Sequence, residues 1–252
     1  MQTSPKPRNR VSSLWNATIN LILPPRCAGS GQIVDAPGML SPTFWGELSF
    51  IEKPFCATCG IPFGFEAPIE TVCAACFDIE PEFDVARSAV VYNDASRKLV
   101  IDFKYGDRMH AVQTFTPWLM RAGKDLLEEC DVILPVPLHG KRLWSRRYNQ
   151  SAELAKMLAK AKKKRCLPSG LIRLRHTVQQ KGLSKKERKN NVKNAFAVNG
   201  RYMHEIRGKK VLLVDDVFTS GATLNECART LKKYGAEQVF VLTIARVTRE
   251  EA

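Results

Sequence analysis

The sequence has 252 residues, of which 44% are hydrophobic and 25% charged, as is usual for a folded soluble chain. The length excludes a mini-protein without a sizeable core, and the composition excludes global disorder and a fibrous repeat. The formal net charge is +14, and residues 141–210 alone hold 22 Lys and Arg against 3 Asp and Glu, or +19. The rest of the chain is mildly acidic, so one continuous stretch carries the whole basic excess and predicts a polyanionic partner.

The sequence contains no targeting or membrane signal that we can identify. No window reaches the roughly 18 apolar residues of a membrane span, and the basic N-terminus lacks the apolar run of a secretory signal. We therefore expect a cytoplasmic protein without a transmembrane segment. In a reducing cytosol, paired cysteines indicate metal ligands before they indicate disulfides.

The chain divides into two regions that differ in their sequence pattern. Residues 1–80 are loop-like and show no long helical periodicity, which predicts a small domain that lacks an apolar core of its own. Residues 81–252 read as strands alternating with helices. We expect first a strand over residues 85–92, helices over 96–105 and 111–129, and a buried strand over 131–134 that ends in a proline-containing loop.

The basic stretch and the C-terminal third continue this alternation. We expect a basic amphipathic helix over residues 144–163, short strands over 171–175 and 195–198, and a polar, mobile loop over 176–193 between these strands. After them come a strand over 210–214, a helix over 222–234 that stops at Gly235, and a strand over 238–245. Alternating strands and helices predict a parallel sheet with a ligand site beyond the carboxyl ends of its strands.

The first stretch that carries chemistry runs from Val211 to Thr223. An apolar strand ends in two adjacent carboxylates, Asp215 and Asp216, and a turn rich in hydroxyls and glycine then opens a helix. Such a turn aims backbone N–H groups and hydroxyls at one point beside the positive end of the helix dipole, which suits a phosphate monoester. The carboxylates suit a sugar cis-diol, with Mg²⁺ bridging nearby oxygens, so the ligand that fits is a ribose 5-phosphate.

Two other interpretations of this stretch stay open: the metal-holding strand of a P-loop ATPase and an accidental match. A P-loop ATPase also needs a GxxxxGK[ST] loop. The three Gly-Lys pairs of the sequence are followed by Asp, Arg and Lys, which disfavours the ATPase.

The second stretch is a pair of CxxC motifs separated by thirteen residues, formed by Cys56, Cys59, Cys73 and Cys76. Two such knuckles supply four thiolates to one tetrahedral site, the preferred arrangement for Zn²⁺. Four unrelated thiols and a redox pair are the alternatives, and the regular spacing outside a βαβ context disfavours both. With all four positions filled by protein, the zinc would be structural and would stabilise a segment that lacks a core.

The thirteen residues from Val211 to Thr223 resemble the 5-phosphoribosyl-1-pyrophosphate (PRPP) motif of type I phosphoribosyltransferases. With the cysteine domain in front of it, the chain resembles the ComF family of competence-associated proteins over nearly its full length. The likeness extends to Pro135-Val136-Pro137-Leu138-His139, Arg142-Leu143, Arg146-Arg147-Tyr148-Asn149-Gln150, Arg173-x-Arg175-x-Thr177-x2-Gln180-x2-Leu183, Arg188-x2-Asn191 and Ala195-Phe196. It implies an α/β chain of the type I phosphoribosyltransferase fold, a mainly parallel sheet flanked by helices, with a small N-terminal zinc-binding domain.

The resemblance also implies roles for single residues. Asp215 and Asp216 would be the catalytic pair that holds the ribose hydroxyls of Mg²⁺-bound PRPP. The 5′-phosphate would be bound by Thr219, Ser220, Gly221, Ala222 and Thr223. The second, pyrophosphate-binding loop would consist of Pro135, Val136, Pro137 and Leu138. Candidate contacts for DNA or pyrophosphate are Arg142, Arg146, Arg147, Arg175, Lys181 and Arg188.

The sequence departs from the family pattern near its N-terminus. Many relatives carry another two cysteine pairs there, whereas Cys27 is followed by Ala28-Gly29-Ser30 and residues 40–45 contain no cysteine. If these positions correspond, a second zinc site has been lost, so we do not count Cys27 among the metal ligands.

Three functions are compatible with the sequence. The ComF resemblance implies a protein for the uptake or cytosolic handling of transforming single-stranded DNA, with other competence or DNA-translocation proteins as partners and PRPP or ribose 5-phosphate as a ligand. The second is an authentic Mg²⁺-dependent phosphoribosyltransferase acting on an amine or nucleobase. The third is a PRPP-sensing regulator that binds partners through the zinc domain. The 22 cations in residues 141–210 exceed what pyrophosphate needs, which favours DNA.

Overall fold

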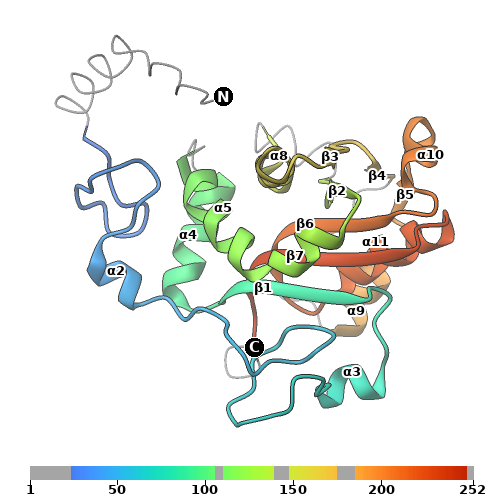
Figure 1. The fold of residues 1–252 in the computed structure, drawn as a ribbon, viewed down its shortest axis with the longest axis horizontal. Coiled ribbons are helices and arrows are strands. Elements are labelled where there is room, and N and C mark those ends of the chain that lie inside the picture. Colours follow the sequence, from blue (N-terminus) through green and yellow to red (C-terminus); the bar gives the residue numbers. More distant parts are fainter. Residues whose placement is uncertain (1–23, 106–109, 139–147, 175–184, 249–252) are drawn as a thin grey trace, which may run out of the picture.

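The structure is a computed structural model that describes residues 24–105, 110–138, 148–174 and 185–248 (Figure 1). Its centre is a five-stranded sheet with the strand order β1-β7-β6-β2-β3. Every neighbouring pair in it is parallel, which confirms the predicted parallel sheet. The strands are β1 (Val85–Val91), β7 (Gln238–Arg246), β6 (Lys210–Phe218), β2 (Val132–Pro135) and β3 (Arg165–Cys166).

Strand β6 is longer than the sequence predicts. We expected it to end at Val214, but it runs to Phe218 and pairs along this length with β7, where Asp215 lies opposite Thr243 and Phe218 opposite Arg246. The pairing partner β7 is apolar and almost wholly buried, and it continues past the carboxylates. The two carboxylates therefore lie within a strand and not in the loop that follows it.

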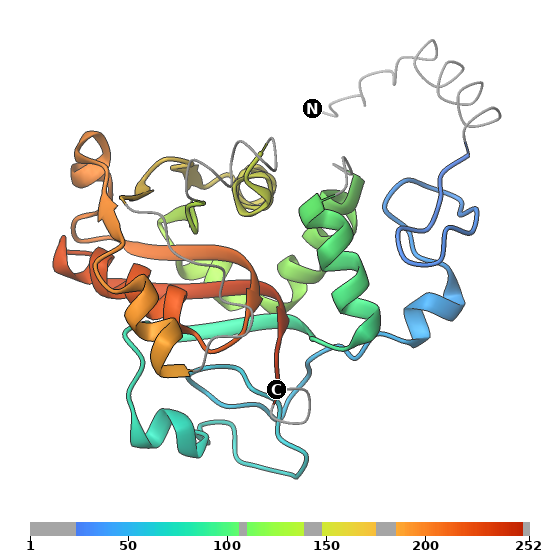
Figure 2. The same ribbon diagram turned by 180° about the vertical axis from the view of Figure 1, so that it is seen from behind.

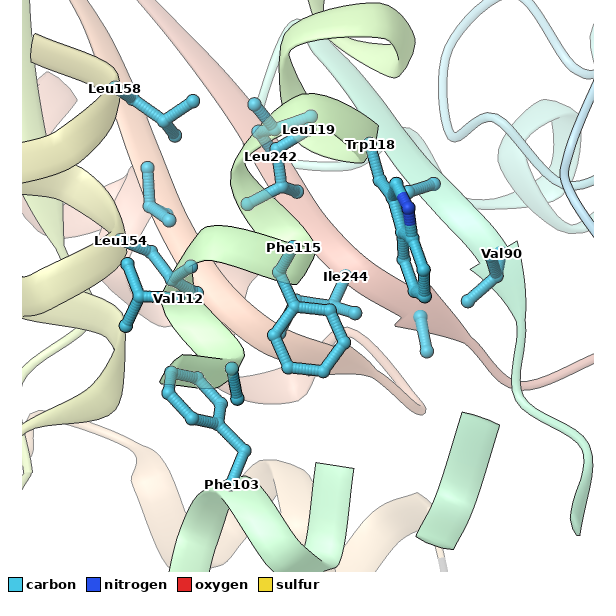
Figure 3. Packing of buried hydrophobic residues seen from close by; sticks show 14 of the residues in the cluster. Val90, Phe103, Val112, Phe115, Trp118, Leu119, Leu154, Leu158, Leu242 and Ile244 are labelled. Carbon is cyan, nitrogen blue, oxygen red and sulfur yellow. The ribbon is translucent and has the colours of Figure 1, made fainter. Parts of the chain in front are cut away.

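One face of the sheet is covered by helices α4 (Asp94–Tyr105), α5 (His110–Ala122), α6 (Lys124–Glu129) and α8 (Gln150–Lys162). Figure 3 shows the core between them, in which Phe115 and Leu119 of α5 lie among side chains of α8 and β7. Phe115 and Trp118 pack edge-on with ring centroids 5.3 Å apart. Burial of such large apolar side chains is the main stabilising contribution to this half of the domain.

Two helix boundaries on this face correct our predictions. The predicted helix over 111–129 is two helices separated at Gly123, where a Cβ atom would lie 2.7 Å from the Leu242 side chain, so a close approach to the sheet requires glycine there. The helix predicted to begin at residue 144 begins at Gln150, because Asn149 caps it by accepting a hydrogen bond from the Ser151 N–H at 3.1 Å. Residues 144–147 lie outside the described residues.

The other face carries α11 (Ala222–Lys233), α9 (Lys185–Val192) and an antiparallel pair of short strands, β4 (Leu171–Arg173) and β5 (Phe196–Val198) (Figure 2). The 3₁₀ turn η1 (Gly200–Tyr202) and helix α10 (Met203–Ile206) lead back to β6. Helix α9 corrects the second half of the mobile loop predicted over 176–193, and residues 176–184 lie outside the described residues. It contacts α11, with Val192 buried in the core and the Asn194 N–H donating to Glu226 at 2.7 Å.

The N-terminal region contains an internal repeat that sequence reasoning missed. We call residues 25–46 the first knuckle and residues 54–78 the second knuckle; each is a hairpin followed by a five-residue helix, α2 (Pro42–Gly46) or α3 (Ala74–Asp78). The hairpins match bond for bond at an offset of 29 residues. The matched bonds run from Cys27 N to Gln32 O (2.7 Å) and Cys56 N to Ile61 O (2.8 Å), from Gly31 N to Cys27 O and Gly60 N to Cys56 O (both 2.9 Å), and from Val34 N to Pro25 O (2.9 Å) and Phe63 N to Pro54 O (3.0 Å).

The two knuckles pack against different parts of the α/β region that contains the sheet. The first lies beside the helical face, where the Lys98 ammonium donates to Gly29 O and the Thr114 hydroxyl donates to Gly38 O at 2.8 Å. The second lies along β1, whose Ala86 N–H donates to Thr58 O at 2.7 Å. Among the described residues, no helix has the length and hydrophobicity needed to span a bilayer.

Candidate functional site

The end of β2 lies beside the carboxylates of β6. The two strands are parallel neighbours, and the last residue of β2, Pro135, lies opposite Val214, directly before Asp215, while β6 continues to Phe218. From β2 the chain goes outward to β3, and from β6 it goes to β7 on the opposite side. Such a reversal of strand order opens a crevice beyond the strand ends, which is where ligands bind in open α/β sheets.

The carboxylates of Asp215 and Asp216 lie at this point and are already hydrogen-bonded. Asp215 accepts from the Ser151 hydroxyl at 3.0 Å and from the Asp216 N–H at 2.9 Å. Asp216 forms an ion pair with the Lys104 ammonium at 2.9 Å. Burial and the neighbouring Asp216 carboxylate raise the pKa of Asp215 to about 7. Because two adjacent, partly buried carboxylates repel each other, the site favours a ligand that brings cations or hydroxyl donors.

Sequence reasoning missed Lys104 and Ser151. Lys104 lies in the last turn of α4 and Ser151 in the first turn of α8, so the tertiary fold brings both to the end of β6. Ser151 directly follows the Tyr148-Asn149-Gln150 stretch that carried part of the family resemblance, and that was the available signal. Gln150 also belongs here, because its amide donates to Lys104 O at 2.9 Å and holds the end of α4 in place.

The β6–α11 loop (Thr219–Gly221) has the features of an anion site. Gly221 has φ +74°, and a Cβ atom there would lie 2.7 Å from the Phe218 ring, so the backbone needs glycine at this position. The Ser220 hydroxyl is buried and has no hydrogen-bond partner in the part of the chain that the structure describes. Helix α11 begins at Ala222 without a side-chain cap, which leaves the positive end of its dipole facing the loop. An oxyanion would satisfy both groups.

The second predicted loop, Pro135 to Leu138, offers less than expected. Proline has no N–H, and the Val136 N–H donates to Val214 O at 2.9 Å, so among these four residues only Leu138 remains as a donor to a pyrophosphate. Asn149 fixes the loop by donating from its amide to Val136 O at 3.2 Å. The loop therefore offers a pyrophosphate few backbone donors.

Most of the basic residues that we expected to contact DNA or pyrophosphate lie outside the described residues. These are Arg142, Arg146, Arg147, Arg175 and Lys181. Arg188 lies in α9, the helix that packs against α11. Their assignment to DNA or pyrophosphate stays a prediction.

The four cysteines of the second knuckle come together as the spacing predicts. The sulfur atoms of Cys56, Cys59, Cys73 and Cys76 all lie within 4.8 Å of one another. The Cys59 and Cys73 sulfurs are 3.7 Å apart, close to the about 3.8 Å that tetrahedral Zn–S bonds of about 2.3 Å require. Cys56 Sγ accepts from the N–H groups of Cys59 at 3.4 Å and Cys73 at 3.3 Å. Backbone donors to the sulfur and a closed set of four thiols fit a structural zinc ion.

The first knuckle has a different set of side chains at the equivalent positions. In the hairpin, Cys27 and Ser30 correspond to Cys56 and Cys59. At the start of the helix, Ser41 and Phe44 correspond to Cys73 and Cys76, because Ser41 precedes α2 as Cys73 precedes α3. The Ser30 N–H donates to Cys27 Sγ at 3.3 Å, the Ser30 and Ser41 hydroxyls are 2.9 Å apart, and the Phe44 ring is buried against Gly29. Burial opposes ionisation of Cys27, but hydrogen bonds from Ser30 and Ser41 outweigh it and lower the pKa of the thiol to about 7. A single cysteine with two serines and a phenylalanine does not make a zinc ligand set, and the loss of a second zinc site stays a prediction.

Two family models match the chain. A phosphoribosyl transferase domain matches residues 164–251, and a double zinc ribbon domain matches residues 18–77. The solved structure of glutamine PRPP amidotransferase from B. subtilis with ADP and GMP is similar at 22% identity and a TM-score of 0.36, over 57% of this chain and 30% of that chain.

The chain is also similar to curated proteins over most of its length. "Competence protein F" of Haemophilus influenzae is 34% identical over 198 residues, which cover 77% of this chain and 85% of the relative. "DNA utilization protein YhgH" of Escherichia coli K12 is 29% identical over 200 residues, with the same coverage of both chains. "Competence protein ComFC" of Bacillus subtilis is 27% identical over 213 residues, covering 79% of this chain and 81% of the relative. Because a double zinc ribbon model matches in front of a phosphoribosyl transferase model, and because a relative named for competence is 34% identical over most of its length, the chain belongs to the ComF family.

Proposed function

We propose that this protein binds PRPP or ribose 5-phosphate at the carboxyl end of β6 and handles single-stranded DNA in the cytoplasm. The observation that carries the ligand is the buried Ser220 hydroxyl, which has no partner among the described residues. It lies in the loop between β6, which carries the two carboxylates, and α11, which has no side-chain cap. A phosphate monoester satisfies the hydroxyl and the helix N-terminus, and a ribose diol satisfies the carboxylates. In this proposal the chain has two domains: residues 1–80 bind zinc, and residues 81–252 bind the ligand.

Each residue of the site has a distinct part in this proposal. Ser220, Gly221 and the first amides of α11 bind the 5′-phosphate, while Asp215 and Asp216 accept hydrogen bonds from the ribose hydroxyls. Lys104 releases Asp216 when the sugar arrives, and Ser151 keeps Asp215 oriented. Mg²⁺ bound with PRPP would supply charge neutralisation for the diphosphate.

The DNA part of the proposal rests on charge and on the relatives. Residues 141–210 carry +19, and the relatives named above are competence and DNA utilization proteins. A pyrophosphate group needs few cationic contacts, whereas an extended strand uses many. DNA affinity should fall steeply with salt, with a log–log slope of about −0.7 per phosphate contacted, and a flat response would contradict this part.

An authentic phosphoribosyltransferase is the second candidate, favoured by the paired carboxylates at the strand end. Catalysis would then be mainly stabilisation of the leaving pyrophosphate by Mg²⁺ and the basic segment while the carboxylates hold the ribose. Release of pyrophosphate from PRPP in the presence of amines or nucleobases would distinguish it from a protein that only binds the ligand.

Calorimetric titration with Mg-PRPP and with ribose 5-phosphate tests the ligand. We expect binding by the wild type and its loss in Asp215→Asn/Asp216→Asn, because the amides no longer provide two carboxylates to the diol. Asp131→Asn is the matched control. Asp131 lies just before β2, at the amino-terminal ends of the parallel strands and away from the site, and its carboxylate accepts from Lys210 N at 2.9 Å. Equal affinity of the double variant and the control would remove the ligand assignment.

The raised pKa of Asp215 adds a pH test. Its carboxyl is protonated below a pH of about 7 and ionised above it, and only the ionised form accepts hydrogen bonds at both oxygens. Affinity for ribose 5-phosphate should therefore rise through this range more steeply in the wild type than in Asp215→Asn. The variant corrects for titration of the phosphate itself, and parallel profiles would count against a contact of Asp215 with the sugar.

A further inference from the structure

Arg246, the last residue of β7, connects the zinc cluster to the ligand site. Its side chain is buried, with 7% of the residue exposed. Nη1 donates to Cys59 O at 2.8 Å and Nη2 donates to Cys59 Sγ at 3.2 Å. A zinc ion with four thiolates keeps a net negative charge, so a guanidinium that donates to one of its sulfurs is a favourable neighbour.

The other side of the same guanidinium lies on the ring of Phe218. The guanidinium carbon is 3.9 Å from the ring centroid, within the range of a cation–π contact. Arg246 and Phe218 are opposite each other in the β6–β7 register, so the sheet itself fixes this stacking. Phe83 meets the Phe218 ring edge-on at 5.7 Å, and Phe218 is buried.

Phe218 in turn supports the β6–α11 loop. Its ring lies under Gly221, where even a Cβ atom would come within 2.7 Å of it. A shift of the ring therefore changes the position of Gly221 and of the first amides of α11. Cys59, Arg246, Phe218 and Gly221 thus form a continuous series of contacts from the metal cluster to the proposed phosphate site.

We propose that Arg246 is a positioning residue that couples zinc in the second knuckle to phosphate binding at the β6–α11 loop. The coupling rests on the proposed ligand site and adds to it a role for the metal beyond holding its own domain. When zinc is bound, the Cys59 thiolate holds the guanidinium on the Phe218 ring, which holds the loop in its binding shape. By linkage, a ligand that stabilises the same shape tightens zinc by the same factor.

Arg87 provides a matched control because it fastens the second knuckle without reaching the loop. Its Nη1 donates to Ala57 O at 2.9 Å and to Ala86 O at 2.8 Å, and its guanidinium lies 4.7 Å above the Phe55 ring. Both arginines therefore dock the knuckle on the sheet, but Arg246 alone of the two contacts Phe218. A purely structural role would make the two arginines equivalent.

The test compares Arg246→Met and Arg87→Met in the full zinc-loaded chain, with ribose 5-phosphate as the probe. We expect both variants to keep the zinc content of the wild type, and Arg246→Met to bind the probe roughly tenfold more weakly, within the range usual for coupled sites. Arg87→Met should bind like the wild type. Arg246→Lys serves if the Met variant does not fold, since lysine keeps the charge but cannot donate to Cys59 in a fork and stack on Phe218.

Two further readouts separate this inference from the proposed function. Saturating ribose 5-phosphate should slow zinc transfer to a chelator in the wild type and leave it unchanged in Arg246→Met. Hydrogen exchange at residues 220–224, measured without any ligand, should be faster in Arg246→Met than in Arg87→Met. Equal exchange in the two variants, together with equal probe affinity, would overturn the coupling. Failure of the wild type to bind the probe, with the exchange difference present, would instead reject the proposed ligand and keep the coupling between knuckle and loop.

Discussion

The two knuckles share the same hairpin but have different side chains at the four ligand positions. The second has four thiols around one point, whereas the first has Cys27, two serine hydroxyls and the Phe44 ring at the equivalent positions. The hairpin bonds differ by only about a tenth of an ångström between them. The hairpin shape therefore does not require four thiols, since an apolar ring and hydrogen bonds take their place in the first knuckle. The knuckle that keeps its thiols is the one that Arg246 joins to Phe218 and the β6–α11 loop.

The largest effect that would sharpen this comparison is removal of one zinc ligand. Cys73→Ser should lower the zinc content from about one ion per chain to none, because a structural site needs all four ligands and contributes folding energy of about 10–16 kcal/mol. Hydrogen exchange should then rise in the second knuckle and stay slow in the first. Metal retained at wild-type stoichiometry would show that other residues hold it.

Restoring the ligands of the first knuckle is the converse experiment. The triple substitution Ser30→Cys, Ser41→Cys and Phe44→Cys places four cysteines, with Cys27, at the positions of the second knuckle. We expect metal analysis to give about two zinc ions per chain, since the hairpin already has the required shape. A value that stays at one would mean that the two knuckles do not correspond in three dimensions.

A smaller effect is expected from the side chain that replaces the metal. Phe44→Ala should lower the free energy of unfolding by about 3–5 kcal/mol, because it empties the buried space beside Gly29. Zinc content should not change. Met39→Ala is the control, because that residue is exposed and its truncation should cost little. Similar losses for the two variants would exclude the ring as the filler of the first knuckle.

The smallest effect concerns the remaining thiol. Cys27→Ala removes one sulfur that accepts the Ser30 N–H, so we expect a loss of about 1 kcal/mol in chemical denaturation and no change in zinc content. A loss of zinc in this variant would contradict a metal-free first knuckle.

The sequence predicted local chemistry well and long-range contacts poorly. The CxxC pairs and the Asp215 to Thr223 stretch predicted a metal cluster and a strand–turn–helix, because each depends on spacing along a short segment. We missed helix α9 because it shows no apolar periodicity: Val192 is its one apolar residue. The helix depends instead on its packing against α11. Lys104 and Arg246 reach the sites from elements distant in the chain, so only the fold could identify them, whereas Ser151 had a sequence signal in the stretch before it.

The most direct test of the central claim is a crystal structure of the protein with ribose 5-phosphate and Mg²⁺. The account predicts the phosphate within hydrogen-bond distance of Ser220 Oγ and the first amides of α11, with the ribose hydroxyls on Asp215 and Asp216 and Lys104 displaced from Asp216. A phosphate bound elsewhere, with Ser220 still unpartnered and the Lys104–Asp216 ion pair intact, would contradict it.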